Sequence, residues 1–429
     1  MSEKKESSLL KFNGKSMVVP FILVTSLFFF WGVANNLNDT MLAAFKKILC
    51  MTDVQTSFIQ MAFYGAYFCL ALPAALFIKK FSYKSGVLLG LILYGIGAFL
   101  YYPAGLSASY GFHLFAIFIL ASGCSILETT SNPYILSMGS PETATRRLNL
   151  AQAFNPFGAG TGIILSMALI LSRLNPADCV QRKQMATEKL QAIQATELGT
   201  ITFTYLCIGV VAVALLLLMI FSKMPKGSDG DTSLHLKSTF GRLFKNKLYK
   251  WGVVAQFFYV GAQVGIWSFT IRIVTSEFKV NGHLINEHGA GYIFLLSIAL
   301  FTVARFIFTF LMRYIKPSKL IIAASVAAFA LTACVVLTHG MFLVVCLVAI
   351  SFFMSLMFPT IYGFALDGLG DDAKVGASGL IMAILGGALL TPTQGWVSDM
   401  FGINNAFIVP MICFAVVGAY GLMARRAGE

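Results

Sequence analysis

The chain has 429 residues, of which 58% are hydrophobic and 11% are charged, and its mean hydropathy is +0.79. This composition excludes a soluble globular domain, because such domains expose far more charge to water. The formal net charge of +13 predicts no nucleic-acid partner, because the basic residues gather in the loops on one side of the predicted membrane helices.

Apolar runs of helical length follow one another along the whole chain. Each is bounded by charge or by Pro and Gly clusters, and each is long enough to cross the ~30 Å hydrocarbon core of a bilayer. We place spans at residues 17 to 38, 54 to 78, 85 to 103, 111 to 137, 148 to 172, 200 to 222, 249 to 275, 289 to 312, 318 to 337, 340 to 366, 374 to 395 and 404 to 424. The sequence therefore predicts an all-α integral membrane protein with twelve transmembrane helices.

A polar segment rich in Pro, Gly and Ser separates the first six spans from the last six, and we interpret it as a linker. The two sets are similar in sequence at corresponding positions: LFIKKFSYKSGVLLG and FLMRYIKPSKLIIAA each join two spans through a basic and aromatic turn. Such duplication is typical of secondary transporters with a midplane site. The predicted units are a cytoplasmic tail (1–16), an N-terminal six-helix bundle (17–222), a cytoplasmic linker (223–248), a C-terminal six-helix bundle (249–424) and a second tail (425–429).

Lys and Arg residues are divided unequally between alternate loops. The tails and loops of one side hold 22 of them and the loops of the other side hold seven. The positive-inside rule places the richer side, with both termini, in the cytoplasm. We expect a multi-pass protein of a bacterial inner membrane.

Apart from lysines at their cytoplasmic ends, the predicted spans carry four charged residues, namely Asp39 at the outer end of the first span, Glu128, Arg272 and Arg305. Each costs a few kcal/mol at mid-membrane, so such residues persist mainly where they are used or paired. Arg272, near the outer interface, is expected to snorkel. Arg305 lies deeper, and it either pairs with a carboxylate or meets the inner headgroups.

The stretch FFFWGVANNLNDTML ends the first span with an unusual run of amides. Helical spacing gathers Trp31, Asn35, Asn36 and Asp39 on one face. We interpret this face as the polar wall of a cavity. The alternative is an outer helix end that Asn38 and Asp39 cap.

Glu128, in SGCSILETTSNPYIL, lies deep in the fourth span, with Asn132 one turn further along. Burial disfavours the charged form of a lone carboxyl, so this group can hold a proton near neutral pH and release it when water enters. We interpret it as a proton carrier. The alternatives are a structural ion pair with Arg305 and a protonated packing residue.

The fifth span carries Gln152 and Asn155 in RLNLAQAFNPFGAGTG. Amides offer both a donor and an acceptor, as vicinal sugar hydroxyls require, although amides also commonly tie membrane helices together. We interpret the glycines that follow as close helix packing. In the second half Tyr259, Gln263 and Phe358 are the candidates. Aromatic rings there can stack on a sugar or simply pack.

Other chemistry finds no support. No His or Cys residues have metal-ligand spacing, and no Walker loop or nucleophile elbow occurs, so we expect no catalytic residue, metal or cofactor. The eight cysteines are scattered, and only Cys50 and Cys179 lie on the predicted outer side. They can pair in an external disulfide or serve as apolar filler.

The segments FFFWGVANNLND, LETTSNPYI, RRLNLAQAFNPFGA, QFFYVGAQVGIWSF and GGALLTPTQGWVSD resemble the fucose/glucose/galactose:proton symporter family of the major facilitator superfamily, over about residues 17 to 424. The resemblance implies two six-helix bundles that rock around a central cavity. It implies proton coupling by Asp39 and Glu128, and sugar contacts from Asn36, Gln152 and Asn155, with Trp31 on the same lining.

The double asparagine of NNLND favours the fucose branch of that family. Phe358 stands where that branch has a tyrosine, so a hydroxyl contact is lost and the sugar preference is open. We expect a monomeric, proton-coupled importer of a monosaccharide, with L-fucose first, in contact with membrane lipid. The alternatives are a glucose/galactose symporter, an uncoupled facilitator or drug exporter of the same fold, a membrane-embedded enzyme on lipid-linked sugars, and a sugar sensor.

Overall fold

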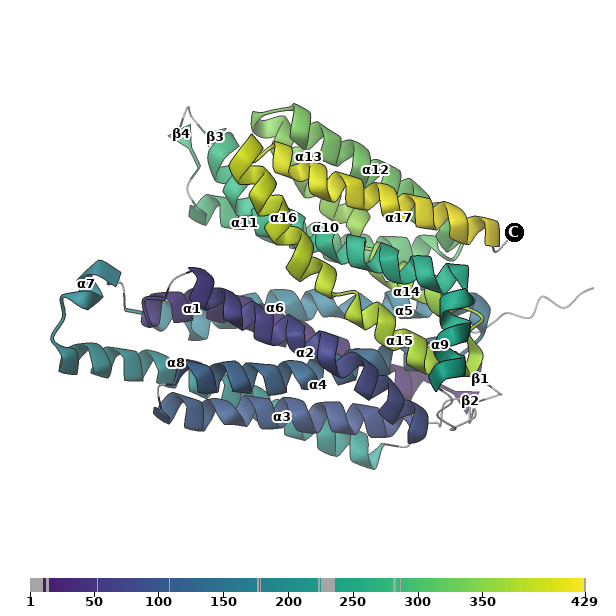
Figure 1. Ribbon diagram of the computed structural model, residues 1–429, viewed down its shortest axis with the longest axis horizontal. Coiled ribbons are helices and arrows are strands. Elements are labelled where there is room, and N and C mark those ends of the chain that lie inside the picture. Colours follow the sequence, from purple (N-terminus) through teal and green to yellow (C-terminus); the bar gives the residue numbers. More distant parts are fainter. Residues whose placement is uncertain are drawn as a thin grey trace, which may run out of the picture.

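The computed structural model describes residues 11–12, 15–51, 53–107, 109–175, 177, 179–222, 224, 236–280, 283–285 and 287–427. Long helices make up almost all of it and run roughly side by side (Figure 1). The helices of the N-terminal half are α1 (Val18–Ile48), α2 (Asp53–Lys80), α3 (Tyr83–Ser107), α4 (Tyr110–Ser137), α5 (Ala144–Gln152), α6 (Phe154–Leu169), α7 (Cys179–Lys183) and α8 (Thr187–Phe221).

The C-terminal half is built in the same way and is preceded by a short helix, α9 (Leu236–Lys245). Its helices are α10 (Lys247–Glu277), α11 (Glu287–Leu311), α12 (Pro317–Leu337), α13 (Gly340–Met354), α14 (Met357–Leu366), α15 (Ala373–Met382), α16 (Leu385–Phe401) and α17 (Ile408–Ala427). Single 3-10 turns are η1 (Pro141–Thr143), η2 (Leu171–Arg173), η3 (Gly370–Asp372) and η4 (Asn405–Phe407). The strands within the described part are four two-residue pieces, β1 (Lys11–Phe12) with β2 (Lys15–Ser16) and β3 (Lys279–Val280) with β4 (His283–Leu284).

Eleven helical stretches of the described residues are long and apolar enough to cross a membrane. The predicted span at 148 to 172 is not among them; its helix is divided at Ala153 into α5 and α6. With that pair, the described part accounts for all twelve predicted spans. Two helices extend well beyond their predicted spans: α1 continues to Ile48, and α8 begins at Thr187.

Two helix breaks follow from prolines. Pro156 and Pro359 have no N–H group, so neither can bond the carbonyl four residues earlier. Those carbonyls belong to Gln152, at the end of α5, and to Ser355, between α13 and α14. The Ala153 N–H is shared between the carbonyls of Asn149 at 3.0 Å and Leu150 at 3.2 Å. Each half therefore carries a break with one unused backbone acceptor.

Close packing of α1 on α6 explains two of the three glycines in GAGTG. A side chain at Gly158 would meet the backbone oxygen of Phe29, and one at Gly162 would meet that of Val33. This confirms the packing interpretation for both positions. At Gly160 the space is open, so there the interpretation is wrong.

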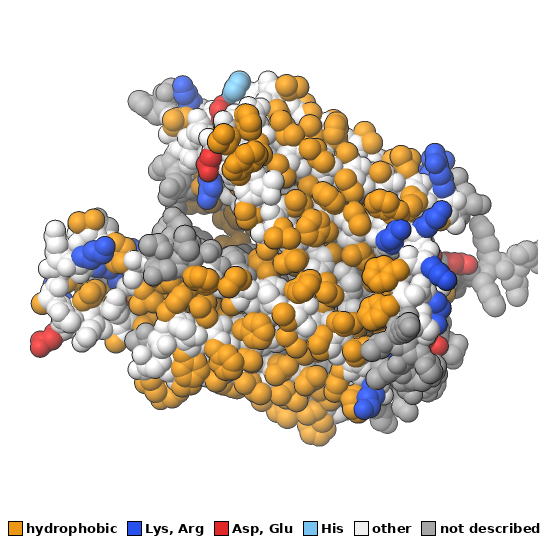
Figure 2. Space-filling model, viewed as in Figure 1, with side chains coloured by type: hydrophobic (Ala, Val, Ile, Leu, Met, Phe, Trp, Pro, Cys, Tyr) orange, Lys and Arg blue, Asp and Glu red, His pale blue; other side chains and the backbone are white. Residues whose placement is uncertain are grey.

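The two halves meet near the end of the molecule that carries α9. There α15 contacts α2 and α4, and α14 contacts α5. At the opposite end, near α7 and the β3–β4 hairpin, the space-filling view shows a hollow between the halves (Figure 2). Hydrophobic side chains cover most of the visible flank between the two ends, as the lipid-facing surface of a membrane protein requires.

The predicted N-terminal tail and the linker fall partly outside the described residues, namely at 1–10, 13–14, 223 and 225–235. Within the predicted linker, residues Leu236–Lys245 form the short helix α9. Arg242 of α9 donates to both carboxylate oxygens of Asp372, at 2.6 and 2.8 Å. These hydrogen bonds raise the pKa of Arg242, so its charge is secure at any physiological pH.

Candidate functional site

The polar face of α1 forms one wall of the candidate site. Trp31 is buried against Phe28, with ring centroids 4.3 Å apart. Asn36 is half-buried and its Nδ2 donates to the Gly32 carbonyl at 3.1 Å. The Oδ1 atom of Asn35 is buried and accepts no hydrogen bond within the described part of the chain. An acceptor of this kind is available to a ligand hydroxyl.

The helical backbone of α1 passes through Asp39 and continues to Ile48. Asp39 therefore lies inside the helix, and the alternative in which it caps a helix end is wrong. The reason is that the apolar pattern resumes after it, which carries the helix three further turns. The side chains of Asn38 and Asp39 lie outside the described residues.

Glu128 occupies the middle of α4 and is 8% exposed. Its neighbour Asn132 is fully buried and donates from Nδ2 to the Glu128 backbone oxygen at 3.0 Å. The Oδ1 atom of Asn132 accepts from Nε2 of Gln152 at 2.8 Å. This chain of bonds ties the Glu128 turn to the break between α5 and α6.

Two tyrosines that the sequence analysis missed stand beside this carboxyl. Tyr67 of α2 faces Glu128 and the Asn35 amide, and Tyr362 of α14 faces Glu128 and Asn132. Both hydroxyls are buried, and neither has a partner of ordinary hydrogen-bond geometry in the described structure. A tyrosine within an apolar span is a weak signal, because most such residues only pack.

Gln152 is buried and Asn155 is half-buried. The Nδ2 atom of Asn155 donates to the Phe28 carbonyl of α1 at 3.1 Å. The side-chain N–H groups of Gln152 and Asn155 thus connect helices, as expected if these amides serve helix packing. This role does not exclude a second one, since each amide also has an acceptor oxygen.

Arg305 links the two helix breaks. Its Nε donates to the Ser355 carbonyl at 2.7 Å and its Nη1 donates to the Gln152 carbonyl at 2.9 Å. These are the two oxygens that Pro156 and Pro359 leave unused. The guanidinium is 4% exposed and lies over the Phe301 ring, 4.7 Å from its centroid.

This geometry corrects both interpretations of Arg305. The guanidinium neither pairs with Glu128 nor reaches the headgroups; its two described hydrogen bonds go to carbonyls. Both carbonyls lie at helix C-termini, where the backbone dipoles present negative charge. The fork of the guanidinium matches two acceptors at once, so one side chain holds the two halves together.

The second half supplies an aromatic wall. The Tyr259 hydroxyl donates to the Met354 carbonyl at 3.0 Å, and the Phe358 ring lies 6.3 Å from that of Tyr259. Trp267 donates to Ser351 Oγ at 3.3 Å. Gln263 is half-buried and makes no polar contact with the described residues. Phe358 and Trp267 are also half-buried, whereas Tyr259 is fully buried.

Contacts between the halves lie on the α9 side of this site. Asn149 Nδ2 of α5 donates to Thr360 Oγ1 of α14 at 3.3 Å, and Gly363 packs directly on Thr145. The hollow of Figure 2 lies on the other side. The site is therefore closed toward α9 and open toward α7.

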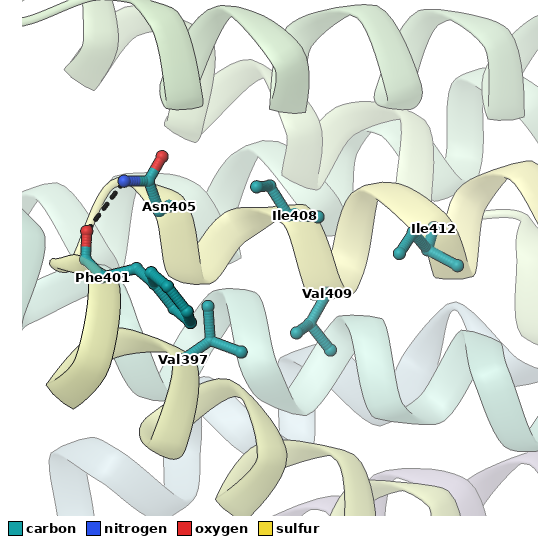
Figure 3. A pocket seen from close by; sticks show the side chains of 6 residues that line it. All are labelled: Val397, Phe401, Asn405, Ile408, Val409 and Ile412. Carbon is teal, nitrogen blue, oxygen red and sulfur yellow. Dashed lines mark hydrogen bonds between the residues drawn. The ribbon is translucent and has the colours of Figure 1, made fainter.

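A separate apolar groove lies between α16 and α17 (Figure 3). It is lined by Val397, Phe401, Asn405, Ile408, Val409 and Ile412. The Asn405 amide is already bonded to the Phe401 carbonyl at 2.7 Å. The other five lining residues are apolar, so the groove suits a lipid chain better than a sugar.

Comparison with known proteins agrees with this architecture. The model of the Major Facilitator Superfamily matches residues 21–385. The L-fucose-proton symporter of Haemophilus influenzae is 39% identical over 427 residues, which cover 96% of this chain and 98% of the relative. A glucose/galactose transporter of Brucella abortus is 35% identical over 94% of this chain and 93% of its own.

A solved structure also matches. The crystal structure of the transporter FucP in the outward conformation superposes with a TM-score of 0.88 at 35% identity, over 95% of this chain and 99% of that chain. The opening toward α7 agrees with this match. The chain is thus an integral, multi-pass membrane transporter of the Major Facilitator Superfamily, in the same group as these sugar transporters, as its sequence motifs predicted.

Proposed function

We propose that this protein imports a monosaccharide, with L-fucose as the first candidate, together with a proton. The observation that carries the proposal is Glu128, a buried carboxyl beside the neutral polar groups of Tyr67, Asn132 and Tyr362. It is supported by a relative named an L-fucose-proton symporter at 39% identity over nearly the whole chain. We place the protein as a monomer in a bacterial inner membrane, with both termini cytoplasmic.

The sugar enters from the open side and meets the amides. Asn35 and Gln152 offer acceptors and donors to neighbouring hydroxyls. Trp31 and Phe358 supply apolar surface for the ring. A 6-deoxy sugar suits Phe358, because a methyl group gains from an apolar neighbour whereas a hydroxymethyl group there would lose its hydrogen bonds.

Protonation of Glu128 makes closure possible. A charged carboxyl sealed from water would carry a large desolvation penalty, whereas the neutral acid can donate to a hydroxyl of Tyr67 or Tyr362. Asp39 is the second coupling group in this scheme. When the cavity opens to the cytoplasm, water stabilises the carboxylate and the proton leaves.

Arg305 holds the outward-open form in this scheme. Opening toward α9 must separate α5 from α14, so the guanidinium must leave either Gln152 or Ser355. Sugar binding at Gln152 and protonation at Glu128 both act on the segment that carries this carbonyl. The hydrogen bond from Arg305 to the Gln152 carbonyl thus couples sugar binding and protonation to the movement of the two halves.

Uptake of radiolabelled L-fucose into proteoliposomes with an inward proton gradient tests the proposal. Accumulation that disappears with a protonophore and resists excess glucose and galactose is the expected result. Uptake of fucose that is indifferent to the protonophore would make the protein an uncoupled facilitator. Competition by glucose or galactose would favour the second candidate, a glucose/galactose symporter, which the Brucella abortus relative supports.

A further inference from the structure

Two thiols meet at the α7 end of the molecule. Cys50 follows the end of α1, and Cys179 begins α7. The Sγ atoms of both residues lie 3.9 Å from the same backbone oxygen, that of Lys47. The two thiols are also close enough to influence each other's electrostatics. Residues far apart in the sequence thus bring their sulfur atoms to the same backbone carbonyl.

The backbone at Cys50 is unusual. Its φ of +50° is the one positive value at a non-glycine residue among those described. Glycine is the ordinary residue for this left-handed position after a helix, because it has no Cβ to clash. A cysteine there ends α1 equally abruptly and adds a thiol that points toward α7.

The segment that presents Cys179 is held firmly. Arg182 donates to both carboxylate oxygens of Glu197 at 2.6 and 2.7 Å, and both side chains are buried. The same carboxylate accepts the Asn175 N–H at 2.8 Å. The hydrogen bonds to Glu197 raise the pKa of Arg182, so Arg182 keeps its charge. Cys179 is therefore fixed beside Cys50.

We propose that Cys50 and Cys179 are the site of a disulfide on the outer face of the protein. The inference rests on the orientation in the proposed function, because only the outer compartment is oxidising. The oxidant is an external disulfide, RSSR. The Cys50 thiolate attacks it and releases one RSH; the Cys179 thiolate then attacks Cys50 Sγ and releases the second. Two protein thiols are oxidised and one disulfide is reduced to two thiols.

The exchange with Cys50 is expected to be slow at neutral pH. Burial and the adjacent Cys179 raise the pKa of Cys50 to about 11, so little of the attacking thiolate is present. Once formed, the bond joins α1 to α7 within the N-terminal half. It does not cross between the halves, so sugar uptake should be unaffected by reduction, while the midpoint of thermal unfolding should fall.

Peptide mapping tests this directly. Intact cells are treated with N-ethylmaleimide, and the purified full-length protein is digested with trypsin without reductant. The expected product joins the peptide 174–182 to the peptide that begins at Ile48, and a reductant separates them. Cys179→Ser should abolish the product. Cys69→Ser, at an exposed thiol of α2, should leave it unchanged.

Alkylation of both thiols, even after the cells are exposed to oxidised glutathione, would overturn the inference. The mapping does not depend on transport. A disulfide between Cys50 and Cys179 in a protein that takes up no sugar would support this inference and refute the proposed function. Sugar uptake by a protein in which both thiols are free would support the proposed function and refute this inference.

Discussion

At the scale of single residues, the site depends on polar groups that the fold leaves incompletely satisfied. Asn35 Oδ1 and the hydroxyls of Tyr67 and Tyr362 are buried without a partner among the described residues. Each such group costs roughly 1–3 kcal/mol while it is unpaired. A sugar hydroxyl or a carboxylic acid proton would recover this energy. The unpaired groups surround Glu128, which is where substrate and proton are proposed to meet.

Replacing Glu128 by Gln tests its role as proton carrier. The amide keeps the size and the hydrogen-bonding capacity of the neutral acid but can never release a proton. We expect exchange of labelled for unlabelled fucose to persist and accumulation against a gradient to be lost. Glu277→Gln is the matched control, because Glu277 contacts the exposed His339 far from the site. Normal accumulation by Glu128→Gln would assign the proton to another group.

At the scale of the helices, the sequence predicted the number and order of the spans because a membrane helix needs one long apolar run. It did not predict the breaks in the spans at 148 to 172 and 340 to 366, although Pro156 and Pro359 were visible. A proline shows that a carbonyl is freed but not what binds it. The partner of both carbonyls, Arg305, comes from a different helix.

Site residues were predicted unevenly for a similar reason. Clustered amides and a buried acid stand out within apolar spans, so Asn132 and Gln152 could be predicted from sequence, and the structure joins them. Tyr67 and Tyr362 could not, because only the packing of α2 and α14 against α4 brings their hydroxyls to Glu128. The roles of all these residues in transport stay predictions.

The packing of α1 on α6 gives a prediction with an internal control. An alanine at Gly158 would press its Cβ on the Phe29 carbonyl, and such overpacking costs about 1–3 kcal/mol. We expect Gly158→Ala to lower the unfolding midpoint of the detergent-purified protein. Gly160→Ala faces open space and should be neutral or slightly stabilising, because alanine favours a helix. Equal effects of the two would refute this account of the interface.

At the scale of the whole molecule, the two halves are closed against each other at one end only. Among the described residues, the polar contacts between the halves at the closed end include the Asn149–Thr360 bond and the bond from Arg305 to the Gln152 carbonyl. A transporter needs such an interface to be stable but reversible, since it must open in every cycle. An arginine on two carbonyls meets this need, because its charge is permanent while its hydrogen bonds can be exchanged.

Arg305→Lys should therefore weaken the outward-open form while the charge is kept. An ammonium group on its flexible stem cannot reproduce the planar fork that reaches Gln152 and Ser355 together, and a lost charged hydrogen bond is worth about 1.5–3 kcal/mol. We expect the initial rate of proton-driven fucose uptake to fall at least about tenfold, because the balance between outward-open and inward-open forms is disturbed.

A cysteine placed at Asn149 should become more reactive toward maleimide in this background. Arg272→Lys, at an exposed side chain over Phe269, is the matched control and should transport normally. Unchanged uptake and unchanged labelling in Arg305→Lys would show that the guanidinium fork does not hold the halves together.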